Sequence, residues 1–275
     1  MLLDTMVREL VVRARLSDAL SPTHIEALAD GDMLAIVVER FTSEDCCAMS
    51  SDRLVHDHRL GGYATDDGAA SIKKIGIPLF EVAGRDPIRR ERYYQSALQT
   101  IRALRAISQP AAYPMDVLRL ALQEQWPEGA DFEMIHPGKK MFVGMPRVFE
   151  AKSGALPHVD RLAWDVPDID NAHSMLAQIA ANIHLRTADR GGEVELWHMQ
   201  PNLDEYDDFR LPGSYGLDQA RLPRPDVVIR PKRGDLILFN ANRIHAVRSC
   251  EGGPRVTVSC FIGYRGVTEP LTYWS

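Results

Sequence analysis

The spacing of apolar residues changes character about halfway along the chain. In the first part it is mostly helical, with apolar residues three or four positions apart over 2–16, 86–107 and 113–126. Residues 21–31 begin with Ser-Pro and end with Gly, which predicts a helix with a serine N-cap and a glycine at its C-terminal end. Residues 33–41 are instead rich in β-branched side chains and predict a strand.

The longest predicted helix and the longest predicted loop both lie in this N-terminal part. The helix over 86–107 has an apolar stripe that we expect to face the core: Tyr94, Leu98, Ile101 and Leu104. Residues 51–75 are rich in Gly, Asp and Ser and show no periodicity, which predicts a surface loop. Few loops of compact domains are that long, so the segment is a candidate lid over a functional site.

The second half of the chain predicts short strands separated by turns. These strands are expected within 139–150, 178–187, 192–199, 226–240, 245–250 and 255–265. Strands at such spacing without intervening helices are typical of a sandwich or barrel, not of a parallel sheet. We therefore predict an α+β fold in which a single domain, 1–275, combines a mainly helical part with one early strand, 1–128, and a jelly-roll core, 129–275.

Composition and charge exclude several classes of protein. Hydrophobic residues make up 45% of the 275 residues and charged residues 25%, which is ordinary for a folded globular chain. The net charge of −6 has the wrong sign for broad contact with nucleic acid. The first residues carry charges throughout, so no signal or membrane-spanning segment is predicted there. We expect a cytoplasmic protein that binds neither nucleic acid nor membranes, and a homodimer is retained as a hypothesis.

The four cysteines favour a reducing environment. Cys46 and Cys47 are adjacent, Cys250 and Cys260 are isolated, and no Cys-x-x-Cys spacing occurs. A bridge between adjacent cysteines would be strained, so we expect all four thiols to be reduced. The spacing also disfavours a thiolate zinc site.

Two histidines and one aspartate form a candidate metal site. His158 and Asp160 are two residues apart, so their side chains share one face if the segment is extended. His245 begins a later predicted strand, and the topology of a β barrel can return it to the same place. Two histidines and a carboxylate leave open positions on ferrous iron, as oxygen chemistry requires.

Arg255 adds a candidate anion-binding group ten residues after the last of these histidines. It opens the predicted strand over 255–265. A planar guanidinium binds a carboxylate through two parallel hydrogen bonds, which suits a dicarboxylate co-substrate.

At these four residues the sequence resembles the iron(II)/2-oxoglutarate-dependent oxygenase superfamily, whose pattern is His-x-Asp, a distal His and an Arg about ten residues later. The segments 191–197 and 231–247, the helical first half and the terminal Tyr-Trp-Ser are similar to one branch of it. That branch contains stand-alone halogenases of alkaloid and amino-acid pathways and hydroxylases of N-substituted amino acids.

The resemblance implies a double-stranded β-helix (jelly-roll, cupin-like) core and three cofactors or co-substrates: Fe(II), 2-oxoglutarate and O2. It implies that His158, Asp160 and His245 ligate the iron, which 2-oxoglutarate chelates, while Arg255 holds the 5-carboxylate. In the halogenases the carboxylate ligand is Gly or Ala, so Asp160 implies hydroxylation of an unactivated C–H. The implied substrate is an amino acid or an amino-acid-derived natural-product intermediate, with desaturation or cyclisation left open.

Further residues are candidates for contacts with the co-substrate or the substrate. On the strand over 178–187, Asn182 and His184 alternate with apolar residues and could face the co-substrate, although a polar outer face would show the same pattern. Three residues are candidates for substrate binding: Arg161, Trp197 and Arg85. For Trp197 the alternative is a core aromatic, and for each arginine it is a surface ion pair.

Other interpretations stay open at this point. His56 and His58 could be a second metal pair, but a surface loop is favoured because no carboxylate has matching spacing. A jelly roll that only binds a ligand would share the fold, and a non-redox cupin-type metal enzyme would share the histidines and carboxylate. Neither of these would need Arg255.

Overall fold

The computed structural model describes residues 9–63, 72–83 and 87–275, and every structural statement below concerns those ranges. Its thirteen strands form two sheets, and helices cover one of them. The strands are β1 (Val11–Arg13), β2 (Ala35–Val38), β3 (Ile72–Lys74), β4 (Ala130–Phe132), β5 (Met145–Phe149), β6 (Ala155–His158), β7 (Ala177–Arg186), β8 (Val194–Leu196), β9 (Val227–Ile229), β10 (Leu236–Asn240), β11 (His245–Val247), β12 (Arg255–Tyr264) and β13 (Leu271–Trp274).

The helices are short except for three in the first half. They are α1 (Leu16–Ala19), α2 (Pro22–Asp30), α3 (Glu44–Val55), α4 (Pro87–Ser108), α5 (Pro114–Gln125), α6 (Leu162–Asp165), α7 (Asp170–His173) and α8 (Leu203–Phe209), with 3-10 turns η1 (Leu79–Glu81) and η2 (Gln219–Arg221). None of those within the described ranges is long and apolar enough to cross a membrane.

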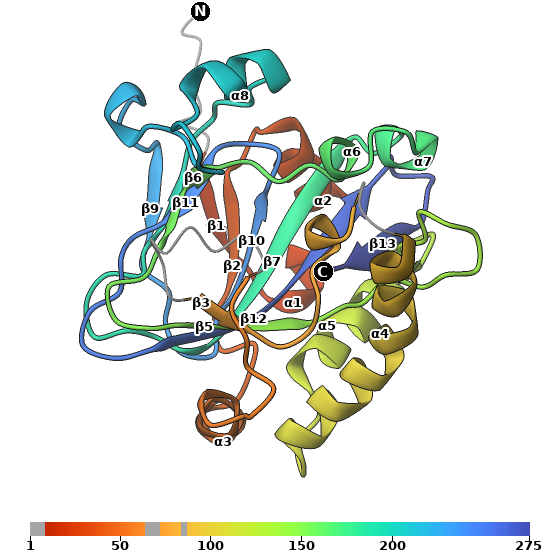
Figure 1. The fold of residues 1–275 in the computed structure, drawn as a ribbon, viewed down its shortest axis with the longest axis vertical. Coiled ribbons are helices and arrows are strands. Elements are labelled where there is room, and N and C mark those ends of the chain that lie inside the picture. The colour runs from red at the N-terminus through yellow and green to blue at the C-terminus, as the bar shows by residue number, and fades with distance from the viewer. Residues whose placement is uncertain (1–8, 64–71, 84–86) are drawn as a thin grey trace, which may run out of the picture.

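The two sheets divide the strands unequally. The large sheet has the order β1-β2-β10-β7-β12-β13-β4, with β5 also paired to β12 and β3 paired to β5. The small sheet has the order β6-β11-β8-β9. Figure 1 shows α3, α4 and α5 gathered on one side of the molecule, away from β6, β9 and β11 of the small sheet. This is the predicted sheet-rich α+β core with helices, and the fold class is confirmed.

Alternation along the central strands explains the layers. On β7, Ile179 and Ile183 point to the helices, whereas Ala180 packs in a second cluster between the sheets. Strand β10 does the same, with Leu238 toward the helices and Phe239 toward the small sheet. The space between the two sheets is where the inward-facing polar side chains of β7 and β12 can gather.

Several predicted elements are confirmed in type and place. Helix α2 has Ser21 as its N-cap, whose hydroxyl accepts from the backbone N–H of His24, and it ends at Gly31 with φ 83°. The predicted strand over 33–41 is β2, and helices α4 and α5 lie where the spacing placed them. All six predicted strand segments of the second half contain a strand.

The helix predicted over 2–16 is wrong for the residues that the structure describes. Val11–Arg13 forms β1, which pairs parallel with β2, and only Leu16 begins a helix. Val11 and Val12 fit the pleated surface of a sheet edge better than a helix, because their side chains are β-branched. The first half is therefore less purely helical than expected, since β1, β2 and β3 all join the large sheet.

Two further corrections concern the long helix and the long loop. In α4, Ile101 and Leu104 of the predicted stripe are buried, but Tyr94 is half-buried and Leu98 is 51% exposed. The buried side chains are Tyr93, Ala97, Ile101, Leu104 and Ile107. Residues 51–55 belong to α3 and 72–74 to β3, so 51–75 is not one continuous loop. The helix buries Ser50 and Ser51, small polar residues that give no apolar periodicity.

Candidate metal centre

Strand pairing brings the predicted ligands together. His158 ends β6 and His245 begins β11, and the two residues are direct antiparallel partners. Asp160 follows β6, and its backbone N–H donates to the carbonyl of Ala241 at 2.8 Å, which fixes the chain just beyond the strand. Residues far apart in the sequence thus meet at one end of the β6–β11 pair.

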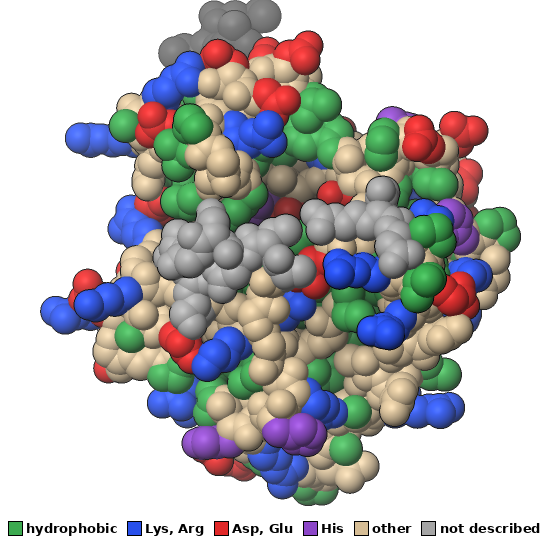
Figure 2. All heavy atoms as spheres, viewed as in Figure 1, with side chains coloured by type: hydrophobic (Ala, Val, Ile, Leu, Met, Phe, Trp, Pro, Cys, Tyr) green, Lys and Arg blue, Asp and Glu red, His purple; other side chains and the backbone are tan. Residues whose placement is uncertain are grey.

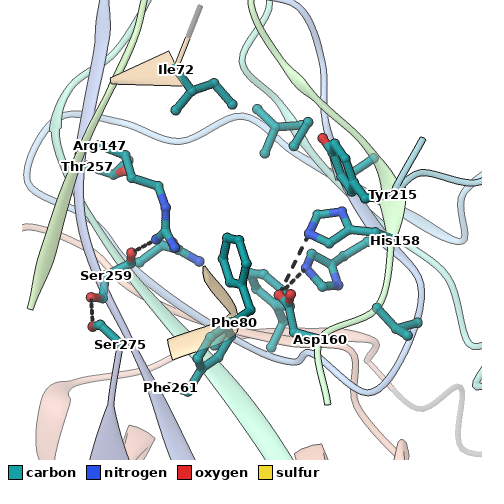
Figure 3. Close-up of a pocket in the computed structure, with 18 of the residues that line it drawn as sticks. Ile72, Phe80, Arg147, His158, Asp160, Tyr215, Thr257, Ser259, Phe261 and Ser275 are labelled. Atoms are coloured by element: carbon teal, nitrogen blue, oxygen red, sulfur yellow. Dashed lines mark hydrogen bonds and ion pairs between the residues drawn. The ribbon is translucent and has the colours of Figure 1, made fainter. Parts of the chain in front are cut away.

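The three side chains converge with their ligand atoms facing one another. Nε2 of His158 lies 3.7 Å, and Nε2 of His245 lies 3.2 Å, from Oδ2 of Asp160. Within the described ranges these residues are the one group of three whose ligand atoms, within 4.8 Å of each other, could hold a metal ion. Figure 3 shows His158 and Asp160 turned toward each other at one side of the pocket.

Backbone carbonyls set the tautomer of both histidines. Nδ1 of His158 lies 2.7 Å from the carbonyl of Leu156, and Nδ1 of His245 lies 3.0 Å from that of Arg243. A carbonyl only accepts, so each Nδ1 carries the proton and donates it. Each Nε2 then keeps a lone pair for a metal, which is how outer hydrogen bonds orient ligating histidines.

The charge states also suit a metal. Burial, together with the neighbouring His245, lowers the pKa of His158 to about 4, so this imidazole is neutral near pH 7. Burial alone would raise the pKa of Asp160, but His158, His245 and Arg147 outweigh it and hold that pKa at about 2. A neutral imidazole and an ionised carboxylate are the forms that bind metal ions.

The triad borders a cavity of about 400 Å³ between the two sheets. A recess with acidic side chains inside it is visible on the face shown in Figure 2. Side chains from alternate positions of β12 form one wall of the cavity: Arg255, Thr257, Ser259 and Phe261. Phe239, Val159 and Phe149 supply apolar surface, so a small ligand would be largely removed from water.

Arg255 has the properties expected of an anion-binding group. It is 3% exposed and lines the cavity, its guanidinium lies 4.5 Å from the centre of the Phe149 ring, and no described residue accepts from its Nε or Nη1. Burial, with a contribution from Arg147, lowers the pKa of Arg255 to about 10, so it is still charged near pH 7. A buried cation with unused donors fits a carboxylate ligand.

Arg147 also lines the cavity, and the sequence analysis missed it. It lies on β5 opposite Thr257, its Nε donates to the hydroxyl of Tyr63 at 2.7 Å, and its Nη1 donates to that of Ser259. Figure 3 shows Arg147, Thr257 and Ser259 on the side of the pocket opposite His158. The available signal was a charged residue in the middle of the otherwise apolar strand Met145–Phe149.

The two candidates on β7 have different surroundings. Asn182 lines the cavity and lies opposite Ser259 on β12. His184 is fully buried and does not line the cavity, and burial beside Arg255 moves its pKa well below the usual value. A direct contact of His184 with the co-substrate remains a prediction. The structure places His184 near Arg255 and outside the cavity lining.

The three residues predicted to contact the substrate also differ in their surroundings. Arg161 lines the cavity. Trp197 does not, because it is fully buried in a cluster with Tyr206 and Ile244, and its Nε1 donates to the carbonyl of Pro223 at 2.8 Å. Trp197 is therefore a core aromatic, as the alternative interpretation of the sequence held. Arg85 lies outside the described residues.

Two other histidines are not part of this centre. The side chains of His56 and His58 are 77% and 92% exposed, and Nδ1 of His56 lies 2.9 Å from the carbonyl of Asp52 in the same helical turn. They lie outside the group that could hold a metal.

The sequence analysis also missed a carboxylate. Asp165 ends α6, directly after Trp164, and lines the cavity. Burial, together with the charge of Asp160, raises its pKa to about 7. No pattern around it distinguished it from the exposed aspartates of the same segment.

Comparison with known proteins gives consistent matches. Residues 145–263 match the family model described as the 2OG-Fe(II) oxygenase superfamily. The L-gamma-glutamyl-L-propargylglycine hydroxylase of Streptantibioticus cattleyicolor is 31% identical over 140 residues, which are 50% of each chain. The L-isoleucine 3(1)-dioxygenase of Pantoea ananatis is 24% identical over 261 residues, 87% of this chain and 82% of that protein. The chain thus spans about half the length of the first of these relatives and most of the second.

Among solved structures, the N-substituted L-amino acid dioxygenase from Burkholderia ambifaria, in complex with alpha-KG, matches with a TM-score of 0.60. The match covers 94% of this chain and 91% of that one at 17% identity, which supports the fold alone. The matched residues 145–263 include His158, Asp160, His245 and Arg255, the four residues on which the resemblance rests.

Proposed function

Because the chain belongs to the 2OG-Fe(II) oxygenase superfamily, we propose that it hydroxylates an unactivated C–H of an amino acid or of an amino-acid-derived natural-product intermediate. One observation carries the proposal: the His158, Asp160 and His245 ligand atoms and the buried Arg255 guanidinium border the same cavity. A non-redox metal site would need only the first three.

The donor set fits ferrous iron. Two neutral imidazole nitrogens and one carboxylate oxygen are the ligands that non-haem iron oxygenases use, and the three would occupy one side of the metal. The cavity borders the triad, so the remaining positions would face the space where a co-substrate and oxygen can enter. In this proposal His158, Asp160 and His245 hold the iron.

The far wall of the cavity fits 2-oxoglutarate. Arg255 would hold the 5-carboxylate with the two donors that have no described partner, and Thr257 lies on the same face of β12. Asn182 lines the cavity within reach of the same wall. Iron and 2-oxoglutarate, when bound, supply with O2 the oxidising power that cleaves the substrate C–H while the co-substrate loses CO2 to give succinate.

The protein's own contribution is to position the reactants and to exclude water. Phe149 and Phe239 line the cavity, and the Phe239 ring centre lies 4.9 Å from that of His245, so apolar surface shields the ligand side of the site. Asp160 fills the position that is Gly or Ala in the halogenases of the branch that the sequence resembles, which supports hydroxylation over chlorination.

The substrate class rests on the relatives. One is a hydroxylase of a glutamyl amino acid and another an isoleucine dioxygenase, so an amino-acid substrate is the shared feature of their names. We also propose a cytoplasmic location, supported by the four free, buried cysteines.

The test is turnover. Purified protein with Fe(II), 2-oxoglutarate and O2 is expected to form succinate faster when pools of free or N-substituted L-amino acids are added, with a matching +16 mass change in one pool member. If succinate forms but no amino-acid pool accelerates its formation, the substrate is not a free or N-substituted amino acid. If no succinate forms at all, the chain is not an active 2-oxoglutarate-dependent oxygenase.

A further inference from the structure

We propose that Asp165 binds the protonated α-amine of the substrate, so that this chain selects free amino acids over their N-acylated forms. This inference rests on the proposed function, because it assigns a substrate class to the same cavity. The relatives do not choose between the two classes, since one is named for isoleucine and the structural neighbour for N-substituted amino acids.

The position of Asp165 is fixed by the segment that carries the metal ligands. It is the last residue of α6, which begins directly after Arg161. The backbone N–H of Leu162 donates to Oε1 of Gln178 on β7 at 2.8 Å, and the N–H of Trp164 donates to the carbonyl of Arg161 at 3.0 Å. The first bond ties the helix to the large sheet and the second closes its own turn, and Asp165 lines the cavity from this position.

The carboxylate of Asp165 has no counter-charge. None of the ion pairs and side-chain hydrogen bonds among the described residues includes it. Its environment penalises the charged form, because burial and the charge of Asp160 both raise its pKa. Asp165 is half-buried, so its carboxylate is only partly hydrated. An ammonium group on a bound ligand would supply the partner that it lacks among the described residues.

The neighbouring side chains suit a zwitterion. Trp164 and Tyr206 line the same part of the cavity with their ring centres 5.3 Å apart, and aromatic faces attract ammonium groups. Arg161 lies over Trp164, 5.0 Å from its ring, and its buried Nε has no partner among the described residues. Arg161 can donate to the substrate carboxylate while the Asp165 carboxylate accepts from the amine.

An N-acylated amino acid would lose one of these contacts. Its amide nitrogen carries no positive charge, so the half-buried Asp165 carboxylate would stay unpaired or would have to take up a proton. A charged hydrogen bond contributes more than a neutral one, so the free amine is favoured.

The experiment follows binding without turnover. The anaerobic protein is loaded with Fe(II) and 2-oxoglutarate, its visible charge-transfer absorption is recorded, and individual proteinogenic L-amino acids and their N-acetyl derivatives are titrated in. Wild type is compared with Asp165→Asn and with Asp168→Asn, which removes an exposed carboxylate of the same segment. Thermal unfolding of each variant is measured in parallel.

We expect at least one free amino acid to perturb the absorption of wild type and of Asp168→Asn, and its affinity to fall roughly ten- to a hundredfold in Asp165→Asn. The melting temperature of Asp165→Asn should not fall, because no described contact is lost. Equal binding of free and N-acetyl forms, unchanged affinity in Asp165→Asn, or binding of no free amino acid would overturn the inference. Loss of affinity together with a lowered melting temperature would point to a structural role and overturn it too.

These outcomes are separate from failure of the proposed function. If the 2-oxoglutarate complex forms and only N-acetyl forms bind, the oxygenase proposal stands and the role of Asp165 falls. If wild type forms no such complex, the proposed function itself fails and this inference with it.

Discussion

His158 and His245 are direct partners across two antiparallel strands, and their ring centres lie 4.2 Å apart. The pairing of β6 with β11 therefore builds the centre, and Asp160 needs only two residues of extended chain to join it. Because strand pairing positions these ligands, substitutions at the ligand positions should change metal binding without unfolding the chain.

Replacing Asp160 tests the carboxylate ligand. Asp160→Gly removes one of three protein ligands, so we expect weaker iron binding and at least roughly a hundredfold loss of hydroxylation, since a missing ligand costs more than a missing outer hydrogen bond. Iron content after gel filtration and succinate release measure the two effects. Full hydroxylation by the variant would show that Asp160 is not a required ligand.

Replacing Arg255 tests the co-substrate site. Arg255→Met keeps the bulk but removes the charge, and the KM for 2-oxoglutarate should rise roughly ten- to a hundredfold, the usual cost of losing a buried charged hydrogen-bond partner. Arg224→Met removes an exposed guanidinium and serves as the control. An unchanged KM in Arg255→Met would show that another cation binds the 2-oxoglutarate carboxylate. Arg147, which also lines the cavity, would be tested next.

Buried thiols should be unreactive in the folded protein. Burial raises the pKa of Cys47 and of Cys260 to about 12. At pH 8 the thiolate fraction of each is then roughly 10⁻⁴, because pH lies far below the pKa. A colorimetric disulfide reagent should detect neither thiol at pH 8 until denaturant is added, and rapid reaction of Cys260 in the native state would contradict its burial.

A buried ion pair away from the cavity should carry stability and not catalysis. Nη2 of Arg265 lies 2.9 Å from Oε2 of Glu133, which is 1% exposed and also accepts from Thr272. Arg265→Met leaves that carboxylate without its cation, so we expect a loss of about 3–5 kcal/mol in the free energy of unfolding.

The matched control for this variant is an exposed pair. Arg190→Met breaks the contact with Glu251, whose atoms lie 3.1 Å apart with both side chains exposed, and should cost less than about 1 kcal/mol. Chemical denaturation of both variants measures the free energy of unfolding that each one loses. Equal losses in Arg265→Met and Arg190→Met would show that the buried pair contributes no more than the exposed one. Turnover per folded molecule should be unchanged in each.

The sequence was most informative where function and local structure coincide. The grouping of His158, Asp160, His245 and Arg255 around one cavity could be predicted because residues two apart in an extended chain share a face and because Arg255 opens a strand. Arg147 and Asp165 could not, since whether a side chain points into a cavity depends on how distant strands and helices pack. Nothing local separates Asp165 from the exposed Asp168.

Errors in the secondary structure have a similar cause. On α4, Ile101 and Leu104 are buried as predicted, but Leu98 is exposed and Ala97 is buried beside it, a choice that depends on how the helix packs against the rest of the fold. Trp197 directly follows β8 and is buried in the core, where its Nε1 donates to the carbonyl of Pro223, a residue far along the chain that local sequence does not bring into view.

The most direct measurement is the visible charge-transfer absorption of the protein mixed anaerobically with Fe(II) and 2-oxoglutarate. Wild type and His56→Ala, which changes an exposed histidine, should both show the band, and His158→Ala should not. Persistence of the band in His158→Ala, or its absence from wild type, would contradict the assignment of this cavity as an iron and 2-oxoglutarate site.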